Sequence, residues 1–153
     1  MRLYDSFETS KHICFVMELC AGGDLLTYVR KRRKLKEDSA KYFFKQLIEG
    51  LAYIHNSRLI CHRDIKLDNI LLDADGKVKI GDFGVSKQVK SETEKMTEQC
   101  GTPAYIAPEI LKDRGYEGFK VDIWSAGVCL YAMLLGTVPF KANSMRELHG
   151  MII

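Results

Sequence analysis

One strand–turn–strand segment constrains this chain more than any other feature. The apolar runs Ile70–Leu72 and Val78–Ile80 are separated by a turn that contains Asp75 and Gly76, a pair typical of β-hairpins. A hairpin brings the residue before its first strand and the residue after its second strand to the same end. Polar groups at those two places should therefore face a common site.

Three short motifs follow one another around this hairpin. Residues 62–69 (HRDIKLDN) precede it, residues 82–84 (DFG) follow it, and residues 107–109 (APE) end the polar segment beyond it. Any one of these triplets occurs by chance, but their order, their spacing and the hairpin between the first two are together specific. In these features the chain resembles the eukaryotic protein kinases over essentially its whole length.

The resemblance implies an α+β fold of the protein-kinase type, mostly the helical large lobe. Residues 1–20 would form the end of the small lobe and the hinge, and residues 21–153 a large lobe truncated at its C-terminal end. The glycine-rich phosphate loop, the strand lysine and the helix glutamate of the family have no counterpart in these 153 residues. We therefore expect a partial kinase domain, with any regulatory domains outside it. The alternative function is a catalytically inactive fragment or pseudokinase-like scaffold.

Apolar periodicity predicts the other elements. Ile13–Met17 is typical of a buried strand, and Asp24 can cap the helix that follows it. Apolar residues at helical spacing between residues 38 and 54 predict an amphipathic helix. Residues 123–140 carry no charge, but Pro139 would end a helix early, so we expect a buried core helix rather than a membrane span. In the polar segment 81–118 we expect only a short helix, near residue 108.

Composition restricts the functional classes. The 23 basic and 20 acidic residues give a net charge of +3, too balanced to indicate nucleic-acid binding. The basic residues 30–36 favour a solvated helix end and loop over a nuclear address or polyanion site. The five cysteines are scattered without a C-x-x-C pair, which favours a reducing compartment. We expect a cytoplasmic protein, with a nuclear location as the alternative.

The resemblance assigns chemistry to the polar motifs. Phosphoryl transfer needs positioning and charge neutralisation more than covalent help. Asp64 would accept or orient the substrate hydroxyl proton, and Lys66 would meet the transferring phosphate. Asn69 and Asp82 offer oxygen ligands for the Mg²⁺ that accompanies ATP. The alternative role for Asp64, Asn69 and Asp82 is turn capping by short polar side chains.

Further roles come from the resemblance alone. The adenine pocket would have Met17 as gatekeeper, hinge backbone groups of Glu18 and Cys20, Leu71 beneath the base, and Asp24 at its edge; plain core packing is the alternative for the apolar members. Structural roles fall on residues of the three motifs and of the core helix: His62 and Phe83 in the regulatory spine, Gly84, Glu109, and Asp122 as a tie to the catalytic-loop backbone.

The branch of the family follows from two features. The chain resembles serine/threonine kinases in having Lys66 two residues after Asp64 and Gly101-Thr102-Pro103 before the APE motif. Thr102 could hydrogen-bond both Asp64 and Lys66. Asp24 and Asp68 fall where basophilic kinases, such as the calcium/calmodulin-dependent and cyclic-nucleotide-dependent branches, face a substrate arginine. We therefore expect protein substrates with basic residues near the target serine or threonine. Asp24 as a mere helix cap is the alternative.

Control of the polar segment can be argued from charge. Arg63 and Lys87 resemble the basic pair that holds a phosphothreonine in the family, yet Glu98 occupies the position usually phosphorylated. Three alternatives stay open here. Glu98 pairs permanently with Arg63, Glu98 is simply exposed, or a neighbouring hydroxyl is the switch: Thr97, Thr93 or Ser91.

Overall fold

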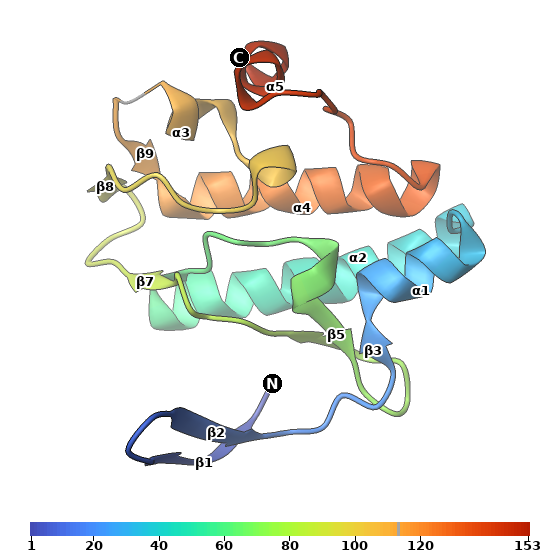
Figure 1. The fold of residues 1–153 in the computed structure, drawn as a ribbon, viewed down its shortest axis with the longest axis vertical. Coiled ribbons are helices and arrows are strands. Elements are labelled where there is room, and N and C mark those ends of the chain that lie inside the picture. Colours follow the sequence, from blue (N-terminus) through green and yellow to red (C-terminus); the bar gives the residue numbers. More distant parts are fainter. Residues whose placement is uncertain (113) are drawn as a thin grey trace.

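The structure is a computed structural model that describes residues 1–112 and 114–153. Its centre is two long helices that run side by side, with the N-terminal strands and the sheet of the predicted hairpin on one side and the C-terminal helix on the other (Figure 1). The helical large-lobe architecture and the mixture of helix and strand agree with the α+β fold predicted from the motifs. The sheets are small, and none has more than three strands among the described residues.

The N-terminal ribbon consists of β1 (Leu3–Glu8) and β2 (Ile13–Met17), paired antiparallel from Leu3↔Met17 to Glu8↔Ile13. The strand predicted at residues 13–17 is confirmed, but the prediction that it is buried is wrong. Phe15 is 59% exposed and Val16 45% exposed. The reason is that no other described strand joins this ribbon, and it lies apart from the helices (Figure 1).

The first two helices follow from capping and periodicity. Strand β3 (Gly23–Asp24) leads into α1 (Leu25–Arg32), whose first turn is capped by Asp24: its Oδ1 accepts a hydrogen bond of 2.7 Å from the Thr27 N–H. Helix α2 (Glu37–Ala52) continues into a π-helical turn, η1 (Tyr53–Ser57). Its buried residues recur at spacings of three and four, as predicted: Ala40, Phe43, Leu47 and Leu51.

The predicted hairpin is present. Strands β5 (Ile70–Leu72) and β6 (Val78–Ile80) pair antiparallel, with Ile70 opposite Ile80, and β3 joins them in a three-stranded sheet of order β3-β5-β6. The turn has Gly76 in the left-handed region at φ 75°, where glycine carries no steric cost. Asp73 Oδ1 accepts hydrogen bonds from the backbone N–H groups of Asp75 and Lys77 and so closes the turn.

Helix α4 (Gly118–Leu135) is the core helix predicted from the uncharged stretch, although it begins before residue 123. It ends at Gly136, whose φ of 73° is a left-handed C-cap and whose absent side chain leaves room for the Arg33 carbonyl oxygen. By length and hydropathy alone, α4 is the one helix of the described chain that could cross a membrane, and 44% of it is buried inside this protein. Its contacts with α2 and its buried charged residue, Asp122, are those of a core helix.

The remaining elements are short. The segment predicted to be mostly irregular contains the expected helix α3 (Pro108–Leu111) and three two-residue strands that were not predicted: β7 (Lys87–Gln88), β8 (Lys95–Met96) and β9 (Tyr116–Glu117). Strand β4 (Ile60–Cys61) pairs with β7, and β8 pairs with β9. The other elements are two 3₁₀ turns and the last helix: η2 (Leu67–Asn69), η3 (Pro103–Tyr105) and α5 (Met145–Ile152).

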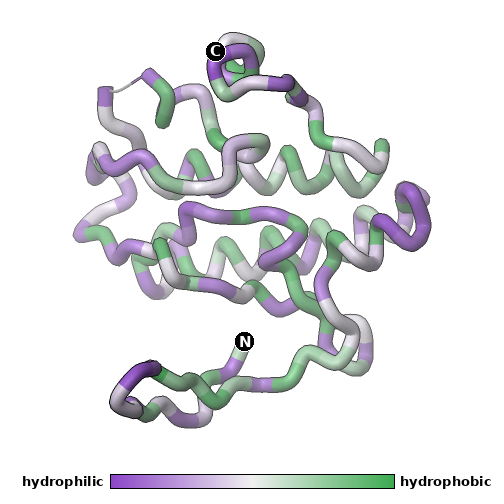
Figure 2. The backbone as a smooth tube through the Cα atoms, in the orientation of Figure 1, coloured by the Kyte–Doolittle hydropathy of each residue, from purple (hydrophilic) through white to green (hydrophobic). Residues whose placement is uncertain are grey.

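Two apolar clusters hold these parts together. The larger one joins α1, α2, α4 and the hairpin through residues such as Leu25, Leu47, Ile70 and Met133. The smaller one lies under the polar segment and includes Cys61, Met96, Tyr116 and Val121. The basic turn after α1 is strongly hydrophilic (Figure 2), and within it only Leu35 is buried. This agrees with a solvated helix end.

Candidate active site

Asp122 fixes the backbone of the loop that precedes the hairpin. Its side chain is 1% exposed, and its two carboxylate oxygens accept hydrogen bonds of 2.8 Å from the N–H groups of His62 and Arg63. His55 Nε2 lies 2.8 Å from Asp122 Oδ2 and completes the set. Arg63 adopts φ 68°, a conformation that non-glycine residues rarely take and that surrounding contacts must impose. The two bonds to Asp122 supply such contacts.

His62 connects this loop to the residues after the hairpin. The side chain is fully buried, its Nε2 lies 2.8 Å from the Gly81 carbonyl oxygen, and its Nδ1 accepts a 3.3 Å bond from the Asp64 N–H. This pattern requires a neutral ring with the proton on Nε2. The ring also packs edge-on against Phe83, with centroids 4.9 Å apart. The structure therefore brings the two predicted spine residues together.

The Asp64 carboxylate is surrounded by donors. Its Oδ1 accepts a 2.7 Å bond from the Thr102 hydroxyl, and its Oδ2 lies 2.9 Å from Lys66 Nζ and 3.2 Å from Asn69 Nδ2. Lys66 Nζ also donates to the Thr102 hydroxyl at 2.9 Å. Burial raises the pKa of Asp64, but the hydrogen bonds from Lys66 and Thr102 outweigh it and hold that pKa below the ordinary value. Asp64 is therefore an ionised acceptor at neutral pH.

Asn69 and Asp82 lie at the same end of the hairpin, as expected. The Gly81 N–H donates to the Asn69 carbonyl oxygen at 2.9 Å, which places Asp82 beside Asn69. Asn69 Nδ2 is committed to Asp64 and Asp82 Oδ1 accepts from the Gly84 N–H, whereas no hydrogen bond within the described chain uses Asn69 Oδ1 or Asp82 Oδ2. Asp82 is exposed and left-handed, at φ 54°.

These free oxygens fit one particular kind of cation. Mg²⁺ takes one or two protein oxygens and completes its shell with phosphate oxygens and water. A site made of one amide and one carboxylate matches that requirement. No group of three or more His, Cys, Asp or Glu side chains that could hold a metal exists within the described ranges. The donor set is thus suited to a cation shared with a phosphate ligand rather than to a closed structural metal site.

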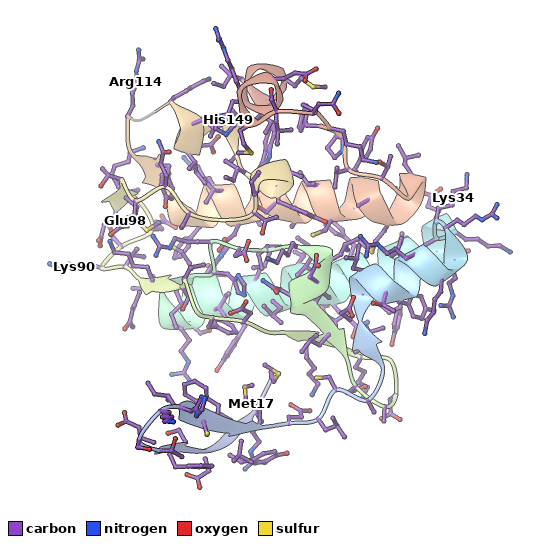
Figure 3. The ribbon with its side chains drawn as sticks, in the orientation of Figure 1. Met17, Lys34, Lys90, Glu98, Arg114 and His149 are labelled. Atoms are coloured by element: carbon purple, nitrogen blue, oxygen red, sulfur yellow. The ribbon has the colours of Figure 1, made fainter. Side chains whose placement is uncertain are left out.

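The predicted adenine-pocket residues lie on the N-terminal ribbon, on the segment that follows it and on the β3-β5-β6 sheet. Asp24 pairs with Leu71 across β3 and β5, and Leu71 pairs with Lys79 across β5 and β6. Glu18 Oε1 lies 2.6 Å from Lys79 Nζ, which ties the segment after β2 to the hairpin. Cys20 is half-buried, while Met17 is 48% exposed. Figure 3 shows Met17 on the N-terminal ribbon. Strand pairing and the ion pair therefore link Glu18, Asp24 and Leu71 to the hairpin sheet, whereas none of these contacts involves Met17.

The acidic residue Glu98 lies between two cations. Its Oε2 is 3.0 Å from Arg63 Nη1 and its Oε1 is 2.8 Å from Lys87 Nζ. Thr97 beside it is exposed. Of the other predicted residues, Asp68 is exposed on η2, and Glu109 is half-buried on α3 without an ion pair within the described chain.

Three contacts of this site were missed at the sequence level. They are the His55–Asp122 pair, the Glu18–Lys79 pair and the bond of 2.6 Å from the Tyr116 hydroxyl to the Glu98 carbonyl oxygen. Only the first had a local signal. His55 continues the apolar face of α2, one helical turn after Leu51, and a buried imidazole requires a polar partner.

Comparison with known proteins agrees with the geometry. The sequence profile described as the protein kinase domain matches residues 1–153, and the chain belongs to the protein kinase family. It is 45% identical over 154 residues to a probable cell cycle serine/threonine-protein kinase CDC5 homolog of Encephalitozoon cuniculi, covering 99% of this chain and 32% of that protein. It is 43% identical to CBL-interacting protein kinase 31 of Oryza sativa subsp. japonica, covering 99% and 34%, and 45% identical to sperm motility kinase 2B of Mus musculus, covering 99% and 31%.

The predicted family is therefore confirmed, and relatives that match almost the whole chain carry the description serine/threonine-protein kinase. The chain spans about a third of the length of the curated relatives it matches. Members of this family use ATP and Mg²⁺.

Proposed function

We propose that the protein carrying this chain transfers the γ-phosphate of ATP to serine or threonine hydroxyls of protein substrates. The observation that supports this most is the Asp64 carboxylate, held ionised among Thr102, Lys66 and Asn69. An ionised, fixed acceptor beside a lysine is what a hydroxyl needs in order to be oriented toward a phosphate. The turn-capping alternative accounts less well for Asp64, because its carboxylate accepts side-chain donors from the loop at Lys66 and from a segment 38 residues away.

Each residue would have a distinct task. Asp64 would orient the substrate hydroxyl and take its proton as the bond to phosphorus forms. Lys66 would place a positive charge beside the transferring phosphate, and Thr102 would fix both side chains by donating to one and accepting from the other. Asn69 and Asp82 would hold Mg²⁺, which supplies neutralisation of the ATP phosphate charge when bound.

A second candidate function is a binding scaffold without transfer activity. The intact set of Asp64, Asn69 and Asp82 favours the kinase, because a protein that only binds has no need for a hydroxyl acceptor beside a cation site.

A transfer assay separates these two functions. The protein is incubated with radiolabelled ATP, Mg²⁺ and a serine peptide, and nucleotide binding is measured in parallel. We expect label on the peptide, and we expect Asp82→Ala to lower the rate by about 10²-fold or more because a group that neutralises phosphate charge is lost. Glu92→Gln, an exposed charge removal in the polar segment, should leave the rate unchanged. Nucleotide binding without transfer by the unaltered protein would instead establish the scaffold.

We further propose a preference for a basic residue before the target hydroxyl. Asp24 and Asp68 supply the negative charge. Burial raises the pKa of Asp24, but the hydrogen bonds from Thr27 keep it below the ordinary value, so the residue is charged at neutral pH. Asp68 lines a pocket of about 320 Å³ that also contains Arg30 and Lys141. Both cations would offset Asp68, whereas of the two only the charge of Arg30 also lowers the pKa of Asp24, so the proposal depends mainly on Asp24.

Asparagine at position 24 tests this preference without breaking the helix. Asn caps helices as well as Asp does, so Asp24→Asn should remove the charge and keep α1 capped. On a peptide array we expect the preference for Arg or Lys upstream of the target to fall about 10-fold, the usual effect of losing one charge-assisted hydrogen bond. Asp68→Asn, the matched variant, should change it less. Equal use of basic and neutral peptides by the unaltered protein would refute the proposal.

Regulation by partners and location complete the proposal. Four relatives are named as CBL-interacting kinases, and by analogy we propose that regulatory contacts form outside residues 1–153. All five cysteines are free thiols, which supports a reducing compartment, cytoplasmic or nuclear.

A further inference from the structure

The activation of this site can be inferred from the charges around Glu98, the second residue after β8. Its carboxylate bridges two cations that come from different parts of the chain: Arg63 next to Asp64, at 3.0 Å, and Lys87 on β7, at 2.8 Å. The hydrogen bond from Lys87 and the charge of Arg63 hold the pKa of Glu98 below the ordinary value. Glu98 lies on the same side of the molecule as β7 and β8 (Figure 3).

Arg63 and the backbone of Glu98 are each held in place by further contacts. The Arg63 side chain is only 11% exposed; its Nε donates to the Val85 carbonyl oxygen at 2.7 Å, and its backbone N–H donates to Asp122. The backbone of Glu98 is held independently, because the Tyr116 hydroxyl donates to its carbonyl oxygen at 2.6 Å. Burial raises the pKa of Tyr116, so that hydroxyl stays protonated and remains a donor. The position of Glu98 is therefore fixed by contacts to its backbone as well as to its side chain.

The bridge is connected to the catalytic carboxylate at both ends. Arg63 directly precedes Asp64, and Glu98 lies shortly before Thr102, the residue that donates to Asp64 Oδ1. Between them Gly101 passes so close to the loop that an added Cβ would lie 2.9 Å from the Arg63 carbonyl oxygen. The ion pair between Glu98 and Arg63 thus also positions the segment that contains Thr102.

We infer that Glu98 is a permanent positioning residue: its fixed negative charge holds residues 85–102 against the catalytic loop, so that transfer requires no phosphorylation of this segment. This rests on the proposed kinase function. The geometry favours it over the two alternatives, since Glu98 is paired rather than free, and a phosphate on Thr97 would meet cations that a carboxylate already neutralises. Because a carboxylate carries about half the charge of a phosphate and Glu98 is 55% exposed, the hold should be salt-sensitive.

Hydrogen exchange tests the placement independently of activity. Amides of residues 90–101 are followed by mass spectrometry in the unaltered protein and in Glu98→Gln, a neutral side chain of the same size. We expect exchange in this segment to become about 3- to 10-fold faster, the effect of losing two partly exposed ion pairs. Glu92→Gln is the matched control, because it removes an equal charge from the same segment and Glu92 has no ion pair or hydrogen bond within the described chain. Equal exchange in the two variants would overturn the inference.

A phosphatase experiment tests the second part of the inference, that transfer requires no phosphorylation of this segment. The purified protein is treated with a broad phosphatase and assayed with ATP, Mg²⁺ and peptide. We expect the treatment to leave the transfer rate unchanged, and we expect Thr97→Ala to have no effect on it. Glu98→Gln should lower kcat several-fold and change the KM for ATP little. Glu98→Asp should restore part of the loss. Inactivation by phosphatase would overturn the inference while leaving the proposed function intact. Absence of transfer before treatment would overturn the proposed function, and the exchange result would still decide the placement of Glu98.

Discussion

Replacing Asp64 with asparagine is expected to lower the rate of phosphoryl transfer by a factor of about 10²–10⁴, the usual contribution of a positioned general base. Asparagine keeps the shape of the side chain and an acceptor for the Thr102 hydroxyl, but it cannot take up a proton. It also loses the ion pair with Lys66 Nζ at 2.9 Å. The measurement is kcat and KM for a serine peptide, and the loss should fall on kcat.

The pH profile of the unaltered protein provides the check on this role. The pKa of Asp64 is held below its ordinary value, so the carboxylate is charged over the neutral range and the rate should fall only as pH drops through that lowered pKa. Thr102→Val removes one of the bonds that lower it, so the acid limb of the profile should move to higher pH. An Asp64→Asn protein with an unchanged kcat would show that Asp64 is only structural.

Replacing Asp122 with alanine is expected to lower the free energy of unfolding by about 3–5 kcal/mol, the cost of deleting one partner of a buried charged network. Two buried donors and one half-buried donor lose their acceptor at once: the N–H group of His62, the ring of His55 and the N–H group of Arg63. The measurement is urea denaturation of the unaltered and variant proteins. Asp75→Ala, in the exposed hairpin turn, should change the stability by less than about 0.5 kcal/mol.

The same network allows a sharper comparison. His55→Ala removes one of the three bonds and the stacking of the ring on Phe119 at 4.4 Å, so it should cost less than Asp122→Ala. In the double variant the two losses should not add, because both remove the His55–Asp122 contact. Fully additive losses would mean that His55 and Asp122 stabilise the fold separately.

Several elements were predictable because the information is local. The alternation of apolar runs around Asp75 and Gly76 specifies a hairpin, and the spacing of Phe43, Leu47 and Leu51 specifies the buried face of α2. The start of α4 was misjudged because Lys120 and Asp122 interrupt the apolar run, although Lys120 is exposed and Asp122 is buried with three partners. The prediction that β2 is buried was wrong, because apolar composition cannot show whether a second layer covers a strand.

In the candidate site, too, some residues could be assigned from the local sequence and others only from the tertiary structure. The residues that bracket the hairpin could be assigned to one site from the chain alone, since antiparallel pairing necessarily brings Asn69 and Asp82 to one end. The partner of Glu98 could not be assigned, and three alternatives remained equal. Arg63 lies 35 residues away and Lys87 lies 11 residues away, and no periodicity relates them to Glu98. The strength of an ion pair depends on distance in space, and only the tertiary packing on Asp122 and Tyr116 brings Arg63 and Lys87 within 3.0 Å of the Glu98 carboxylate.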